Sequence, residues 1–258
     1  MKMRGTKRML LVLAVLAVLS GSVSGARGQA ALGAKPVQEK AAAALPTADQ
    51  IFEKYIQSLG GKTAIEQLKT ELQTGTFEGN GGNMPVEIAI KAPNKWRFEI
   101  KLPDGNAFKQ LSNGEKGWRV DPQHGVEEMT RDHMLLTSRF LNLQGPIHFK
   151  EIFTKVEVKG KEKHGGRDCY QIEATPIEGK PQTMFFDVET GFLLSVDFTV
   201  EMNQGTFSAG MDFDDYKEVQ GVKIPFTLHQ VGDEEWTIRF TEILRDIALD
   251  DKQFEKPE

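Results

Sequence analysis

Few side chains in this sequence have the types and spacing that metal or acid–base chemistry requires. No two of its five histidines are four residues apart, and none belongs to a His-Glu-x-x-His pattern. That spacing would place two imidazoles on one face of a helix, where they can bind zinc. The sequence therefore predicts no metal site and no cofactor. The histidines are His124, His133, His148, His164 and His229.

The single cysteine, Cys169, is the one thiol that could act as a nucleophile. It alternates with Tyr170 and Ile172, so on a strand its side chain projects from the face opposite to theirs. A catalytic thiol needs a base close to it in space, and His164 and His229 are the candidates. We favour an inert strand cysteine over a catalytic one.

Acidic pairs and a glycine cluster also have simpler explanations than catalysis. Pairs such as Glu127-Glu128 and Asp214-Asp215 are adjacent, and adjacent residues on a strand point to opposite faces. They therefore cannot form a general acid–base pair. The Gly79–Gly82 cluster lacks the lysine and the following helix of a phosphate-binding loop, so we expect a hairpin turn there. We predict no catalytic residues and expect that the protein is not an enzyme.

The sequence is distinguished by its large apolar side chains: it contains sixteen phenylalanines and nine methionines but only three tyrosines. Many of these residues alternate with polar ones and so share one face of a sheet. That face either encloses a cavity for an apolar ligand or forms a solid core, and both interpretations stay open. The candidate cavity residues are Trp96, Phe98, Phe198, Met211, Phe213, Phe226, Trp236 and Ile238, with Met134, Leu136, Phe140 and Leu141 on a covering lid.

The elements that position these residues are mainly strands, because apolar residues recur with a period of two over most of the chain after Thr70. One example is the run from Phe207 to Phe213. A second is the run from Phe192 to Val200, in which we place Phe192 and Leu194 on the apolar face and Leu193 and Ser195 on the polar one. Turn signals such as Asn113-Gly114 and Gln220-Gly221 separate the runs. We predict about a dozen antiparallel strands in one sheet.

Helical spacing appears in two places. Two capping-box patterns, Thr47 with Gln50 and Thr63 with Glu66, predict two short helices before the sheet. An insertion from Thr130 to Leu143 then interrupts it. Each helix has one apolar stripe and must bury it. We therefore predict an α+β fold, in which a curled antiparallel sheet forms an unclosed half-barrel whose apolar concave face is covered by N-terminal helices and a helical lid.

The N-terminus has the order of a secretory signal: four basic residues, an apolar run from Met9 to Leu19, and then small residues. We predict cleavage after Ala26, with Ala30 as the alternative site; an uncleaved anchor is disfavoured because the run is too short to span a bilayer. We expect a signal peptide at 1–26, a flexible linker at 27–46 and one domain at 47–258. No lipobox cysteine follows the signal, so we expect a soluble periplasmic protein.

Net charge argues against nucleic acid as a partner. The chain has a net charge of −5, and loss of residues 1–26, which contain four basic residues and no acidic one, leaves −9. A net acidic chain is unsuited to a phosphate backbone.

Together, the order of these elements and several local motifs resemble the LolA/LolB-like superfamily, in particular its outer membrane lipoprotein-sorting relatives. The resemblance covers most of the mature chain. It implies a half-barrel that holds lipid or lipoprotein acyl chains between membranes, a membrane-bound donor or acceptor protein, and a monomer. The matching stretches are Tyr55–Gly61, Ala92–Arg97, Asn113–Trp118, Gly165–Ala174, Phe186–Leu194, Tyr216–Thr227 and Phe240–Phe254.

Three function classes follow from these observations. The first is a non-enzymatic carrier or chaperone that shelters an acyl chain in the concave face. The second is a structural or interaction module of the cell envelope with a solidly packed core. The third is a hydrolase, which ranks last because the sequence contains no nucleophile–base constellation.

Overall fold

The computed structural model describes residues 44–232 and 234–257. The expected signal peptide and the linker up to residue 43 lie outside the described residues. The remainder forms one compact unit, from Ala44 onward.

The unit is built on one antiparallel sheet of 13 strands in the order β6-β5-β4-β3-β2-β1-β13-β12-β11-β10-β9-β8-β7. The first and last strands of the chain, β1 and β13, pair with each other in the middle of the sheet. Strands β6 and β7 are its open edges. The sheet is therefore an unclosed half-barrel, as predicted. The strands are β1 (Thr70–Gly79), β2 (Gly82–Lys91), β3 (Lys95–Lys101), β4 (Ala107–Ser112), β5 (Gly117–Asp121), β6 (Gly125–Glu128), β7 (Phe153–His164), β8 (Arg167–Pro176), β9 (Gln182–Asp187), β10 (Leu193–Met202), β11 (Gly205–Val219), β12 (Val222–Gly232) and β13 (Trp236–Arg245).

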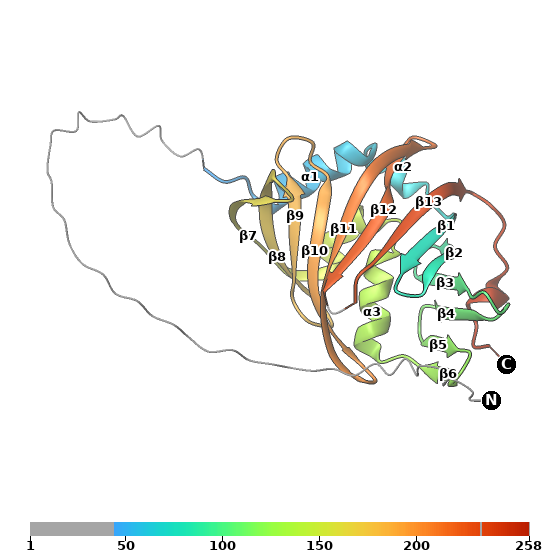
Figure 1. Ribbon diagram of the computed structural model, residues 1–258. Coiled ribbons are helices and arrows are strands. Elements are labelled where there is room, and N and C mark those ends of the chain that lie inside the picture. The colour runs from blue at the N-terminus through green and yellow to red at the C-terminus, as the bar shows by residue number, and fades with distance from the viewer. Residues whose placement is uncertain (1–43, 233, 258) are drawn as a thin grey trace, which may run out of the picture. The chain divides into compact units, whose positions relative to one another are not determined.

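Two short helices precede the sheet, and a helical insertion joins its two open edges. The helices are α1 (Ala48–Leu59), α2 (Lys62–Glu66), α3 (Arg131–Phe140), the 3-10 turn η1 (Gly145–His148), α4 (Phe149–Ile152) and the C-terminal 3-10 turn η2 (Asp251–Phe254). Figure 1 shows α3 lying across the face that the sheet curls around. Within the described part of the chain, no helix has the length and apolar character to cross a membrane.

The helix ends test the capping predictions. Thr47 and Gln50 form the predicted capping box at α1, and Gly60, with a φ of 125°, ends that helix. The box predicted at Thr63 is wrong, because α2 begins at Lys62 and its N-cap is Gly61, which has no side chain to accept a hydrogen bond. Gly60 also approaches the β11–β12 turn closely: a Cβ at this position would lie 2.1 Å from the carbonyl oxygen of Gly221. A larger residue is therefore excluded there.

Apolar residues of the strands pack against the helices on the concave face. Ile51 and Phe52 of α1 pack with Ile172, Met184 and Phe186. Alternation holds through most strands but fails at the start of β10, where the register shifts between Leu193 and Ser195. The predicted placement of Leu193 on the polar face is therefore wrong: its side chain is buried against the α1 cluster.

The outer face is not uniformly polar, because the C-terminal segment covers part of it. Phe254 of η2 is fully buried, and η2 packs against β3. The carboxylate of Asp251 forms ion pairs with Lys91 at 2.8 Å and with Lys95 at 3.3 Å. The segment after β13 thus fastens to the outer face of the β2–β3 region, which leaves the outer face of β9–β12 as the open side of the sheet.

Candidate functional site

Helix α3 is held over the concave face by its N-terminal cap and by two polar contacts. The side chain of Thr130 accepts a hydrogen bond from the backbone N–H of His133 at 3.2 Å, and its hydroxyl donates to the carbonyl of Glu201 on β10. The carboxylate of Asp132 accepts from the backbone N–H of Glu201 at 2.6 Å. The polar N-terminus of the helix is therefore fixed to the end of β10.

One side of α3 packs against β10 and β11. Leu136 belongs to the buried cluster that contains Phe198 and Met211, and Phe140 packs against the same cluster. The ring of Phe140 lies edge-on to that of Phe198, with centroids 5.4 Å apart, and it also meets Phe213 at 6.3 Å. The predicted lid residues therefore reach the predicted wall residues.

The other side of α3 packs against β3. Met134 is buried with Trp96 and Met129, and Leu141 packs against this group. The indole N–H of Trp96 donates to the hydroxyl of Ser138 at 2.8 Å, and that hydroxyl donates to the carbonyl of Met134 at 2.8 Å. Trp96, which is fully buried, thus anchors the helix.

The eight predicted wall residues all lie on strands of the concave side, but their burial divides them into two groups. Trp96, Phe198, Met211 and Ile238 are buried. The other four are half-buried, so part of each side chain remains accessible to solvent or to a ligand. These four are Phe98, Phe213, Phe226 and Trp236.

Strand register aligns three half-buried residues and the buried Ile238 in one row. Phe213 lies opposite Leu228, which lies opposite Ile238, which in turn lies opposite Phe77. The rings of Phe77 and Trp236 have centroids 5.6 Å apart. The row therefore crosses β11, β12, β13 and β1, and it forms an apolar surface that continues toward Phe98.

Sequence reasoning missed several members of this surface. Phe77, Met84, Leu102 and Leu228 are half-buried and pack against the same cluster as Phe98 and Trp236. Phe77 and Met84 are directly paired on either side of the β1–β2 turn. Their signal in the sequence is weak, because the neighbouring inward positions of β1 are Gly75, Gln73 and Glu71 rather than apolar residues.

The concave face also contains an unpredicted buried ion pair. Nε of Arg245 donates to the carboxylate of Glu71 at 2.6 Å, and both side chains are almost fully buried. The same carboxylate accepts from the amide of Gln73 at 2.6 Å. Arg245 also donates to the carbonyls of Val219 and Val222 in the β11–β12 hairpin. The arginine therefore fastens β13 to β12 beyond the four residue pairs over which these strands are hydrogen-bonded.

Polar groups near α3 are strongly affected by burial. Burial, followed by the positive charge of Arg119, lowers the pKa of His133 to about 4. Burial also lowers the pKa of Arg139, and Nε of Arg139 and Oε1 of Gln182 are buried without a hydrogen-bond partner among the described residues. These atoms leave one hydrogen-bond donor and one acceptor without a partner near α3.

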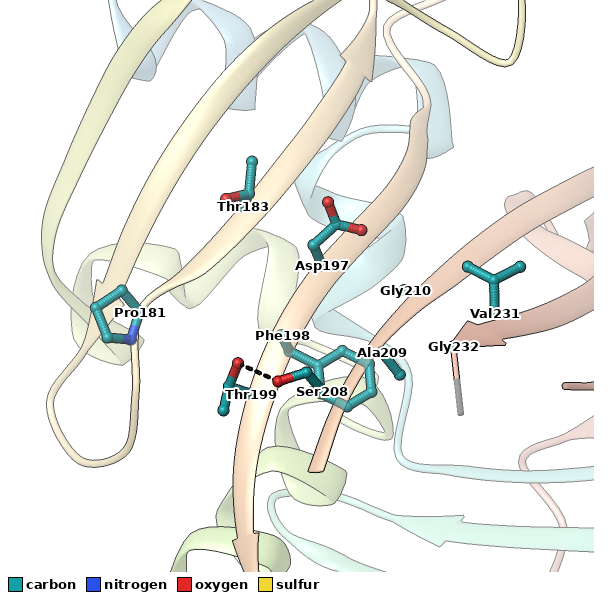
Figure 2. Close-up of a pocket in the computed structure, with 10 residues that line it drawn as sticks. All are labelled: Pro181, Thr183, Asp197, Phe198, Thr199, Ser208, Ala209, Gly210, Val231 and Gly232. Atoms are coloured by element: carbon teal, nitrogen blue, oxygen red, sulfur yellow. Dashed lines mark hydrogen bonds between the residues drawn. The ribbon is translucent and has the colours of Figure 1, made fainter. Parts of the chain in front are cut away.

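On the outer face of β9–β12, the strands form an open groove of about 480 Å³. Asp197 lies opposite Thr183 on one side and Gly210 on the other, and Gly210 lies opposite Val231. Figure 2 shows this row, with the hydrogen bond between the hydroxyls of Thr199 and Ser208, which measures 2.9 Å. The groove lies on the opposite side of the same strands from Met211.

Beside the groove, the structure brings together a serine, a histidine and an aspartate. The His164 ring stacks on Phe185 at 4.5 Å, and its Nε2 lies 3.4 Å from Asp212. Ser195 lies between them in register, opposite Phe185 on β9 and Asp212 on β11. Its hydroxyl is buried and has no hydrogen-bond partner in the described chain. The serine is therefore not activated by the imidazole, as a hydrolase nucleophile would have to be.

Cys169 also lies on this side, opposite Asp187 and fully buried. Burial, followed by the negative charge of Asp187, raises the pKa of the thiol. A raised pKa disfavours the thiolate, the nucleophilic form of cysteine. Among residues 44–232 and 234–257, no group of three or more histidine, cysteine, aspartate or glutamate side chains is arranged to hold a metal ion.

Comparison with known proteins identifies the fold. No protein-family model matches the chain, and no curated protein matches it in sequence. Among solved structures, an outer membrane lipoprotein-sorting protein domain from Vibrio parahaemolyticus superposes with a TM-score of 0.56 at 14% identity, covering 80% of this chain and 97% of that one.

Two further solved structures superpose about as well. A DUF1329 family protein from Desulfovibrio piger gives a TM-score of 0.55 at 13% identity, covering 80% of this chain and 96% of that one. A LolA superfamily protein from Nitrosomonas europaea gives 0.55 at 12% identity, covering 82% and 99%. At such identities the likeness is one of fold. The predicted resemblance is confirmed at that level.

Proposed function

We propose that this chain, which has a LolA-like fold, binds the acyl chain of a lipid or lipoprotein on its concave face without covalent chemistry. The observation that carries the proposal is the row of half-buried apolar side chains beneath and beside α3. Large side chains in a packed core are normally buried completely. Here Phe77, Phe98, Phe213 and Trp236 keep accessible surface although they share one face.

The energy of such an interaction is sufficient for a carrier. Burying one methylene group stabilises a complex by about 0.8 kcal/mol, so even half of a sixteen-carbon chain contributes roughly 6 kcal/mol before the cost of ordering it. The ligand would enter where α3 contacts β10 and β3, because those contacts are made by one helix of ten residues. Opening this helix would leave the sheet intact.

A charge on the concave wall tests the proposal. Met211→Lys should abolish binding of a fluorescent fatty acid, because the ammonium group would be buried against Leu136 and Phe198. Ser208→Lys is the matched control. Ser208 lies three residues before Met211 on β11, and its exposed side chain is on the outer face of the sheet. Fluorescence titration measures affinity, and circular dichroism verifies folding. A folded Met211→Lys protein that binds as well as the parent would contradict the proposal.

A second function remains a candidate because half of the predicted wall, including Trp96 and Ile238, is fully packed. In that case the concave face is an ordinary core and the chain is an interaction module. Native mass spectrometry of freshly purified protein distinguishes the two. Lipid-sized adducts support a carrier, whereas a clean mass of the protein alone supports the module.

We further propose that the chain is exported to the periplasm, loses residues 1–26 and exchanges its acyl cargo with a membrane-bound donor or acceptor as a soluble monomer. The basic start and short apolar run of the sequence support export. N-terminal sequencing of material from the periplasm should begin at residue 27. An intact Met1 on membrane-bound protein would contradict export.

A further inference from the structure

The outer groove is built around a carboxylate that lacks a partner. Asp197 makes no ion pair or hydrogen bond with the described residues, although most other acidic side chains on this sheet are paired. The reason is local: its strand neighbours are Thr183 and Gly210, which carry no charge. Gly210 allows the carboxylate to lie close to β11, since a Cβ there would be 3.0 Å from Oδ1 of Asp197 and 2.9 Å from Cγ2 of Val231.

The electrostatics of the groove are those of a site for a positive charge. Asp197 is exposed in the groove, but its partial burial raises its pKa, the carboxylates of Asp212 and Glu162 raise it further, and His164 opposes them. The direction of this shift agrees with the geometry, in which no cationic side chain of the described residues pairs with the carboxylate. A bound cation would supply that partner. Ser195 lies on the same face, two residues before Asp197 and beside the groove rather than in its lining, and its hydroxyl is buried and unpartnered among the described residues.

The rest of the lining limits the kind of cation. Hydroxyl oxygens of Thr183, Thr199 and Ser208 add neutral acceptors, and Pro181 and Val231 add short apolar edges. A quaternary ammonium group is normally held by aromatic faces, and Phe198 packs with its ring in the concave-side cluster instead. An ammonium group with three N–H donors can use the carboxylate and the hydroxyls together.

We propose that this groove binds a primary ammonium group carried on a short aliphatic stem. The group can come from a soluble alkylamine or from the ethanolamine head group of a lipid. The site is separate from the acyl surface, because it lies on the other face of β10 and β11. Either proposal can therefore fail without the other.

Titration of the full domain with 1,4-diaminobutane, followed by NMR chemical shifts of the backbone amides of residues 197–210, tests the site. Asp197→Asn should weaken binding by about tenfold or more, because it removes the charge and keeps the shape. Glu127→Gln is the control: it removes one exposed carboxylate on β6, at the far edge of the sheet, and should leave the affinity unchanged. Gly210→Ala retains the charge but displaces the carboxylate and should also weaken binding.

Vesicles of phosphatidylcholine with and without phosphatidylethanolamine then separate the two sources. Binding that requires phosphatidylethanolamine and Asp197 identifies a lipid head group, whereas diamine binding without vesicle binding identifies a soluble amine. The proposal is overturned if the parent protein does not bind the diamine, or if Asp197→Asn and Gly210→Ala both bind it as the parent does. Circular dichroism of each variant verifies that the domain is folded, so this test does not depend on fatty-acid binding.

Discussion

The two faces of β10 and β11 differ although they are made by the same residues in alternation. On the concave face, Phe198 and Met211 are buried beneath Leu136 of α3. On the outer face, Asp197 and Ser208 are exposed and line an open groove. Asp197 directly precedes Phe198, and Ser208 lies three residues before Met211. Because side chains alternate with a period of two, one pair of strands can build an apolar surface and a polar one back to back. Changes at adjacent positions should therefore affect one face only.

The same contrast holds for ion pairs. Arg245 and Glu71 on the concave side are almost completely buried, whereas Arg97 on the outer face of β3 pairs with Glu87 and Glu99 and retains 17% of its side-chain exposure. Water and salt screen the outer network in part. The inner pair has no such screening, so each partner depends on the other.

The largest expected effect is loss of one partner of the buried pair. Arg245→Met should lower the free energy of unfolding by about 3–5 kcal/mol, because Glu71 would be left buried without a counter-charge. Arg97→Met on the outer face should cost less, about 1 to 2 kcal/mol, because Glu99 keeps an ion pair with Lys109 at 3.6 Å. Urea denaturation measures both. The double variant Glu71→Leu with Arg245→Met should recover most of the loss; equal losses from the two single variants would remove the distinction between the faces.

Titration of His133 gives the next largest effect. Its pKa is about 4 in the folded protein and near the ordinary 6.5 in the unfolded chain. The unfolded state therefore binds the proton more tightly between these values. Stability contributed by the neutral imidazole is complete above pH 6.5 and is lost as the pH falls toward 4, by on the order of 2 to 3 kcal/mol.

Urea denaturation at pH 7 and pH 4.5 measures this loss. His133→Gln should reduce the difference between the two pH values by about 2 kcal/mol. His124→Gln, in the exposed turn before β6, is the control; it removes only an exposed pair with Asp121 and should change the difference by at most about 0.5 kcal/mol. The same pH dependence in the parent and in His133→Gln would mean that other groups dominate acid unfolding.

Much of the arrangement of the concave face was predictable because it follows from periodicity. The alternation around Phe198, Met211 and Ile238 predicts which side chains share a face, and the structure places all three in the concave clusters. The helical stripe containing Leu136 and Phe140 predicts an apolar-faced helix, and α3 is observed there. Such patterns are local, so one sequence is sufficient to read them.

Other features depend on pairing between distant strands and could not be predicted. Glu71 and Arg245 are 174 residues apart and meet because β1 pairs with β13. Asp197, Gly210 and Val231 form a groove only when three strands come into register. The shift at Leu193 arises from a bulge, which moves side chains to the other face without changing composition.

Ligand binding should change the local stability of α3 more than that of the sheet. Without ligand, amides from Met134 to Leu143 should exchange quickly, because opening the helix costs less than unfolding the sheet. With fatty acid at 100 times its dissociation constant, opening should cost about 2.7 kcal/mol more, so exchange slows about 100-fold. Amides near Phe213 should stay protected in both states. Equal protection of α3 and β11 in the ligand-free protein would favour the interaction module.

The smallest expected effect concerns the anchor between Trp96 and Ser138. Trp96→Phe removes the indole donor at 2.8 Å from the Ser138 hydroxyl, and loss of one neutral hydrogen bond costs about 1 kcal/mol in addition to the lost packing. Since this bond joins β3 to α3, the loss should appear as faster exchange within α3. Trp118→Phe is the matched control, because Trp118 is also buried but faces outward opposite Leu111 on β4.

Both substitutions remove the same atoms, so they should cost similar packing energy, and Trp96→Phe should cost about 1 kcal/mol more because it also loses a hydrogen bond. Only Trp96→Phe should lower the cost of opening α3, and with it the time that a fatty acid remains bound. If Trp118→Phe accelerates exchange in α3 equally, then the helix senses the stability of the whole sheet. In that case α3 is a fixed part of the core, and the concave and outer faces do not act independently.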